Sequence, residues 1–195
     1  TVGDEAPAVV VELSAELMAQ SVALGLQMAE HLHREIPELV ASGELLIEET
    51  RASCESNLQQ SLGLLRQAAA PEDLVVTPQA RRYVRTYIDR GLELPVLLRT
   101  YRLGHSWMWG QWSAALHERV ESAEELAEVL EFSSHWMCEY IDLISAALVE
   151  EFAAEQAQLA RGTDQLRAEA VKALLAGGAA DIDASSRRIG YELRG

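Results

Sequence analysis

The chain has 195 residues with a formal net charge of −15, and 49% of them are hydrophobic. This apolar fraction excludes an intrinsically disordered chain, and the length allows one well-cored domain with the start of a second. The surplus of carboxylates excludes direct nucleic-acid binding, because contact with phosphates needs clustered Lys and Arg.

Apolar residues recur at spacings of three and four nearly throughout, which predicts an all-α helical bundle. A first helix is expected over residues 9–35 and ends at the Ile36-Pro37 pair. A second is expected over residues 44–70, where Pro71 stops it. The apolar side of the first helix is marked by Leu13, Leu17, Val22, Leu24, Met28 and Leu32.

Three further helices are expected over residues 78–90, 95–120 and 123–159. Thr77 supplies an N-cap hydroxyl for the first of these, and Gly91 fits the left-handed residue that closes it. Ser122 and Glu125 form a capping box for the third, which Gly162 is expected to end. Connecting helices are then expected over residues 162–195, the first of them capped by Thr163 and the last beginning near Asp183.

The last of these three helices carries an apolar seam formed by Ile144, Leu148, Phe152 and Leu159. The seam runs past the expected end of the bundle, so it can be buried only against another helix. A second copy of the chain is the natural supplier of that helix. The sequence therefore predicts a homodimer.

The stretch LLRTYRLGHSWMWGQW, residues 97–112, is apolar over much of its circumference and predicts a central helix. Gly104 in mid-helix indicates that a neighbouring helix crosses closely there. Plain core packing is one interpretation of this helix. Another is a pocket for a small-molecule effector, lined by Tyr101, His105, Trp109 and Trp112. A third makes His105 the axial ligand of a haem.

No metal site, cofactor or catalytic group is predicted. The one E-x-x-H spacing, Glu30 to His33, is a single copy of a motif that di-iron bundles use twice, and no nucleophile motif or phosphate-binding loop is present. Cys54 and Cys138 lack metal-ligand spacing, and we expect both to be buried and reduced. No secretion signal opens the chain and no apolar run reaches the ~20 residues that cross a bilayer, so a cytoplasmic protein without membrane contact is expected.

Several segments together resemble bacterial regulators of the PucR/CdaR type. They are EIPEL at 35–39, the later helix with Asn57 and Leu58, RGLELPVLLRTYRLGHSWMW at 90–109, and LRAEAVKALLAGG followed by RRIGYEL. The N-terminal part also resembles the helical input domain of RsbR-type stressosome proteins, whose fold is likened to a globin without haem. The resemblance implies a sensor and dimerisation domain over residues 1–161. Residues 162–195 would then lead to a following GGDEF-like domain.

Together these observations predict a non-enzymatic signalling and dimerisation domain of a bacterial transcriptional regulator. Such a domain transmits an effector or assembly signal to an attached output domain. The alternative is a haem-binding globin-type sensor with His105 as axial ligand. Both hypotheses require the same all-α fold.

Overall fold

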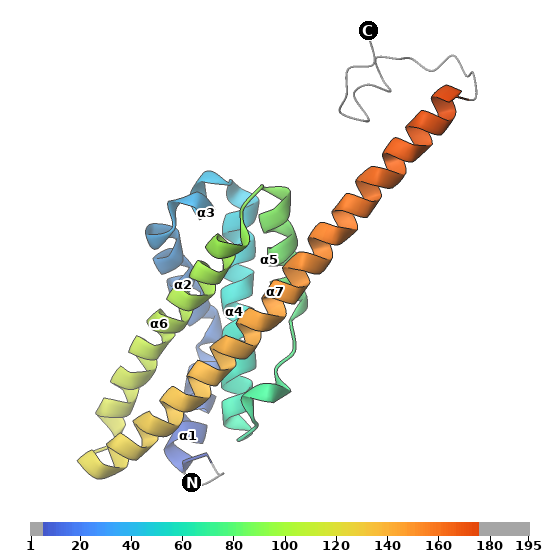
Figure 1. The fold of residues 1–195 in the computed structure, drawn as a ribbon. Helices are drawn as coiled ribbons and strands as arrows, with labels where there is room; N and C mark the ends of the chain where they lie inside the picture. Colours follow the sequence, from blue (N-terminus) through green and yellow to red (C-terminus); the bar gives the residue numbers. More distant parts are fainter. Residues whose placement is uncertain (1–5, 176–195) are drawn as a thin grey trace. The chain divides into compact units, whose positions relative to one another are not determined.

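The computed structural model describes residues 6–175, and over that range it contains helices and no strand (Figure 1). The predicted all-α helical bundle is therefore confirmed. The helices are α1 (Ala8–Ala19), α2 (Ser21–Glu35), α3 (Pro37–Ala41), α4 (Glu44–Arg66), the short 3-10 helix η1 (Pro71–Asp73), α5 (Pro78–Asp89), α6 (Leu94–Arg119) and α7 (Ala123–Leu175).

The chain divides into two compact units, Thr1–Phe152 and Ala153–Gly195, and the boundary falls within α7. In the first unit α4 is the helix on which the others assemble, because it contacts α1, α2, α3 and α5. Helix α6 packs on α2 from another side. The core of this unit is made of Leu, Met, Tyr and Trp side chains that come from all of these helices and from the first part of α7.

The predicted first helix is in fact two helices, because the chain leaves the helical conformation at Gln20, where φ is −105° and ψ is 7°. Helices α1 and α2 meet there at an angle of 80°. The bend allows both helices to contact α4. Leu24, Met28 and Leu32 are buried as predicted, whereas Val22, also predicted on the apolar side, is 66% exposed because residues two apart lie on nearly opposite sides of a helix.

Among the described residues, no single helix is both long and apolar enough to cross a bilayer. The pair α1 and α2 would pass such a test together, but only across the bend between them.

Two helix crossings are close enough to require glycine or a yielding neighbour. A Cβ atom at Gly25 would lie 2.9 Å from Cα of Glu55, so α2 and α4 meet there almost backbone to backbone. A Cβ atom at Gly104 would lie 3.3 Å from Sδ of Met28. The close crossing predicted at Gly104 is therefore confirmed, and the helix that approaches is α2.

The predicted capping groups are found at the ends of α5 and the start of α7. The Thr77 hydroxyl accepts a hydrogen bond from the amide of Ala80 at 3.2 Å. Gly91 closes α5 with φ +68°. The amide of Glu125 donates to the Ser122 hydroxyl at 3.3 Å. These short-range motifs were correctly predicted because each is completed within a few residues.

The C-terminal half of α7 corrects two predictions. Gly162 does not end the helix, which continues to Leu175, and Thr163 is not an N-cap because its hydroxyl donates to the carbonyl of Leu159 at 3.0 Å. A glycine inside a helix costs about 1 kcal/mol relative to alanine, which a long run of helix-forming residues offsets. The division at residues 161 and 162 stays a prediction, and the final helix predicted from Asp183 lies outside the described residues.

The apolar seam of α7 is also corrected. Ile144, Leu148 and Phe152 belong to the buried core of the first unit, so they do not await a partner. Leu159 remains 44% exposed. Among the side chains that the structure describes beyond Phe152, the large apolar ones that are exposed are Leu159, Leu166 and Val171. Cys54 is buried as predicted, whereas Cys138 is exposed.

Candidate functional site

One face of α6 forms the innermost surface of the first unit. The buried residues of this helix recur at spacings of three and four, as an amphipathic helix requires, and they are Leu97, Thr100, Gly104, Met108, Trp112 and Leu116. Trp107 and Trp109 are half-buried on either side of this line. Residues 97–112 therefore carry a face that belongs to the core, as their periodicity predicted.

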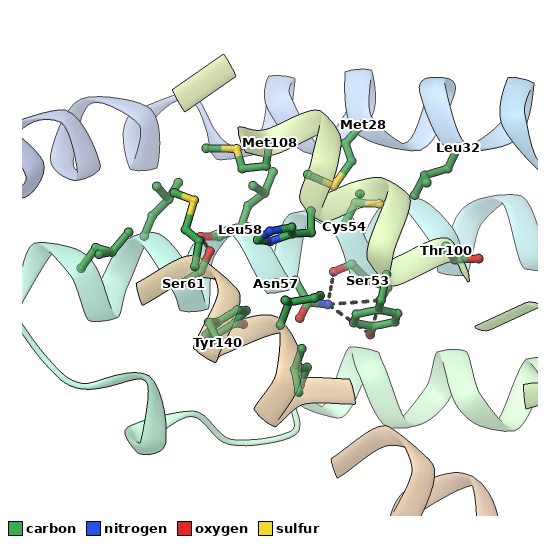
Figure 2. Close-up of a pocket in the computed structure, with 18 of the residues that line it drawn as sticks. Met28, Leu32, Ser53, Cys54, Asn57, Leu58, Ser61, Thr100, Met108 and Tyr140 are labelled. Carbon is green, nitrogen blue, oxygen red and sulfur yellow. Dashed lines mark hydrogen bonds between the residues drawn. The ribbon is translucent and has the colours of Figure 1, made fainter. Parts of the chain in front are cut away.

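A cavity of about 80 Å3 lies between α6 and its neighbours (Figure 2). Helix α2 contributes Met28 and Leu32 to its lining, and α5 contributes Tyr83. The other lining residues come from α4, α6 and α7, and they are Ser53, Cys54, Asn57, Leu58, Ser61, Leu62, Leu65, Thr100, Tyr101, Gly104, His105, Met108, Trp136, Met137, Tyr140, Ile141 and Ile144.

The structure places two of the four predicted pocket residues at this cavity. Tyr101 and His105 line it, whereas Trp109 and Trp112 do not. Trp112 is fully buried in the core, and its indole N–H has no hydrogen-bond partner among the described residues. Trp109 is half-buried against the core. Whether the cavity holds a ligand stays a prediction.

The polar wall of the cavity comes mainly from α4, which the sequence analysis did not select. The amide of Asn57 donates to the Ser53 carbonyl at 2.9 Å and to the Tyr101 hydroxyl at 3.2 Å (Figure 2). The hydroxyls of Ser53 and Tyr101 are 3.1 Å apart. Burial raises the pKa of Tyr101 to about 12. The group stays a neutral phenol, and it joins α4 to α6.

His105 differs from this cluster because neither of its ring nitrogens has a hydrogen bond to another described residue. Burial lowers its pKa, and the nearby charge of Asp142 opposes that shift. The neutral form is therefore favoured near pH 7, and it offers one N–H donor and one nitrogen acceptor.

Sulfur atoms form a large part of the apolar wall. Three of the four methionines in the chain, Met28, Met108 and Met137, line the cavity, together with Cys54. Burial raises the pKa of the Cys54 thiol to about 12. The thiolate is the form that attacks electrophiles and binds metals, so Cys54 acts here as a neutral, apolar group.

With its side chains in their present positions, the cavity has neither a set of ligands for a metal ion nor the space for a haem. The described residues contain no group of three or more His, Cys, Asp or Glu side chains arranged to hold a metal ion. Ligand pockets for drug-sized molecules typically measure about 300–1,000 Å3, and the cavity, at about 80 Å3, is well below that range. The haem hypothesis for His105 therefore requires the surrounding side chains to move apart.

A second polar structure lies beside the cavity and joins α4, α5 and α6. The Thr50 hydroxyl lies 2.7 Å from the Leu46 carbonyl and 2.9 Å from the Tyr83 hydroxyl. The Tyr87 hydroxyl is 2.8 Å from that of Thr100, which donates to the Val96 carbonyl at 2.9 Å. Burial raises the pKa of Tyr87 to about 12, so this hydroxyl chain is uncharged.

The fold and the cavity define a class, a small all-α domain with an uncharged central site. The family model described as "RsbT co-antagonist protein rsbRD N-terminal domain" matches residues 22–167, which is most of the chain. The chain belongs to this family, and its members are signalling domains of the stressosome type. The resemblance to RsbR-type input domains is thereby confirmed. Comparison with the curated proteins and with the solved structures gives no match.

Proposed function

We propose that the chain is a non-enzymatic sensory and dimerisation domain of a bacterial transcriptional regulator, and that it passes an effector or assembly signal to an attached output domain. The observation that supports this most directly is that α7 lines the cavity and continues as one helix to Leu175. A turn or shift of α7 at the cavity acts on whatever segment is joined to its C-terminal end.

Besides its buried apolar side chains, helix α7 makes hydrogen bonds to the rest of the first unit that can be exchanged at low cost. The indole N–H of Trp136 donates to the Ala69 carbonyl at 3.1 Å, and the side chain of Gln60 donates to the Tyr140 hydroxyl at 3.3 Å. A hydrogen bond contributes about 1 kcal/mol net. Two arrangements of α7 that differ in these bonds can therefore be close in free energy, as a switch requires.

Dimerisation is proposed through the part of α7 beyond Phe152. Leu159 and Leu166 are exposed and seven residues apart, so they lie on the same side of the helix. A second copy of the same helix can cover them in a symmetric pair. With Ile144, Leu148 and Phe152 already buried in the first unit, Leu159 and Leu166 are the residues on which this part of the proposal depends.

Light scattering of the purified chain over micromolar to millimolar concentrations tests the dimer. A dimer is expected for the natural sequence and a monomer for the double variant Leu159→Glu/Leu166→Glu. Val75→Glu is the matched control, because Val75 is 67% exposed in the first unit, and it should remain dimeric. A natural chain that stays monomeric throughout overturns the dimerisation proposal.

The regulator context is supported by the resemblance of residues 90–109 to PucR/CdaR-type proteins. The reading frame that contains this chain provides a direct test. A helix-turn-helix encoded after residue 195 supports a transcriptional regulator, and a frame that ends without any output domain overturns it.

A further inference from the structure

We infer that the cavity between α2, α4, α5, α6 and α7 binds a small uncharged aromatic molecule that carries one hydrogen-bonding group. This inference rests on the proposed function and deepens it, because such a molecule would be the effector that the domain reads. Four properties of the cavity support it, namely its size, its lack of charge, its sulfur and aromatic walls, and one unused polar group.

The size of the cavity limits the ligand to a few atoms. Its volume is about 80 Å3. A water-sized group needs roughly 10–15 Å3 of such space. The cavity therefore holds on the order of five to eight non-hydrogen atoms. Phenol falls within this range, whereas nucleotides and haem do not.

The lining excludes a charged ligand. No Asp, Glu, Lys or Arg side chain is among the lining residues. Transfer of an ion from water into such a site, without an opposite charge to pair with, is strongly unfavourable. Asp142, the carboxylate whose charge acts on His105, is itself exposed. The ligand that fits is therefore neutral.

The apolar wall favours an aromatic ring. Thioether sulfurs make favourable contacts with aromatic rings, and methionine side chains adapt to the shape of what they contact. Met28 and Met108 both line the cavity. The rings of Trp136 and Tyr140 are stacked at the α7 side, with centroids 5.5 Å apart and planes 9° apart. A flat ring can pack against these surfaces.

The hydrogen-bonding group of the ligand is assigned to His105. The other side chains at the wall that carry a hydroxyl, an amide or an indole N–H each have at least one hydrogen bond within the chain. The imidazole of His105 lines the cavity without a hydrogen bond from the described residues. It can accept from or donate to one hydroxyl or carbonyl of a bound molecule.

Nuclear magnetic resonance of the full chain, labelled at its methionine methyl groups, tests the inference with phenol as the probe. Phenol should shift the signals of Met28, Met108 and Met137. Met18 is the internal control, because its methyl group packs against Gly63 and not at the cavity. Benzoate, the charged analogue, should shift none of the three. No response to phenol, or an equal response of Met18, overturns the inference.

The polar contact is tested by comparing phenol with benzene. Phenol should bind about tenfold more tightly, which corresponds to one hydrogen bond of about 1.4 kcal/mol. In His105→Phe this preference should disappear, whereas His117→Phe, an exposed histidine of the same helix, should keep it. If His105→Phe does not fold, the ratio of the affinities for phenol and benzene in the natural chain remains as the test. Equal affinities there overturn the assignment of His105.

The requirement for an aromatic ring is tested by comparing phenol with cyclohexanol. Cyclohexanol has the same polar group on a saturated ring of the same size, and it should bind more weakly than phenol. Equal binding contradicts an aromatic ligand class. Light scattering separates these results from the proposed function. A chain that is dimeric but does not bind phenol contradicts only the ligand inference, and a chain that binds phenol but is monomeric contradicts only the dimerisation proposal.

Discussion

The phenolic oxygens of Tyr83 and Tyr87 lie 3.3 Å apart, and theirs is the longest contact in the hydroxyl chain beside the cavity. The chain has four hydroxyls, from Thr50, Tyr83, Tyr87 and Thr100, and ends on a backbone carbonyl at each side. It therefore has five contacts but only four hydrogens, so one contact must lack a hydrogen. The length of the Tyr83–Tyr87 contact indicates that this is the contact without a hydrogen.

Removal of one tyrosine hydroxyl from this chain should therefore cost little. In Tyr83→Phe or Tyr87→Phe the three remaining hydrogens each keep an acceptor, so no donor is left unpaired. The free energy of unfolding should fall by about 1 kcal/mol, the net value of one hydrogen bond. Chemical denaturation measures it, and a loss of several kcal/mol in either variant would contradict the count of hydrogens.

Tyr101→Phe should be more costly than either of these changes. It removes one acceptor of the Asn57 amide and the hydroxyl partner of Ser53 at once, in a partly enclosed site. A loss of about 2 kcal/mol is expected. Denaturation under the same conditions ranks the three variants, and a Tyr101→Phe variant as stable as Tyr83→Phe would show that the Ser53–Asn57 cluster contributes nothing measurable.

The ends of α4 and α5 offer a matched pair of substitutions. Each helix ends in the same motif, but the left-handed residue is Ala68 in the first, with φ +51°, and Gly91 in the second. Because a side chain is disfavoured there, Ala68→Gly should stabilise the fold by about 0.5–1 kcal/mol and Gly91→Ala should destabilise it by about 1 kcal/mol. Changes of the same sign in both variants would refute this account.

The crossing of α2 and α4 predicts a severe effect at Gly25. In Gly25→Ala the added Cβ meets the backbone of Glu55, which cannot rotate away, so a loss of about 2–3 kcal/mol is expected. Gly110→Ala is the control, because nothing lies within 4 Å of its added Cβ. That variant should gain about 0.5–1 kcal/mol in helix stability. Thermal unfolding that ranks the two variants in the opposite order would contradict the predicted crossing.

Two histidines predict how stability depends on pH. Burial lowers the pKa of His33, with Arg51 acting in the same direction and Glu30 against it, and burial also lowers that of His105. The unfolded chain then binds protons that the folded chain does not, so stability is fully present above about pH 6.5 and is lost as the pH falls below it. Chemical denaturation at pH 8 and pH 5 should show that the free energy of unfolding falls less in the double variant His33→Gln/His105→Gln than in the natural chain. The same fall in both proteins would contradict the assignment to these histidines.

Much of the fold could be predicted because its signals are local. Thr77 and Gly91 mark the ends of α5 through bonds within one turn, and the periodicity of α6 marks its buried face. The break at Gln20 could not be predicted in this way. No proline or glycine stands there, and the packing of both halves on α4 is not visible in the local sequence.

The candidate site was predicted only in part for a similar reason. Tyr101 and His105 were found because they share a helix face, whereas Asn57 and Tyr140 reach the cavity from helices far away in sequence. A signal for Asn57 existed, since it stands four residues after Ser53 and therefore on the same face of α4 as that residue. Trp109 and Trp112 share that helix face but do not line this cavity, because a wheel gives the direction of a side chain from the axis but not which neighbour it meets.

In the proposed mechanism, the uninterrupted course of α7 through Gly162 makes the spacing between the cavity and an attached output domain a matter of rotational phase. Each residue of an α-helix advances by about 100°. One residue inserted after Leu159 would turn everything downstream by that angle, and seven would restore nearly the original orientation. In the proposed mechanism, regulators built on this domain should therefore tolerate linkers that differ by whole heptads and lose their response when the difference is one or two residues.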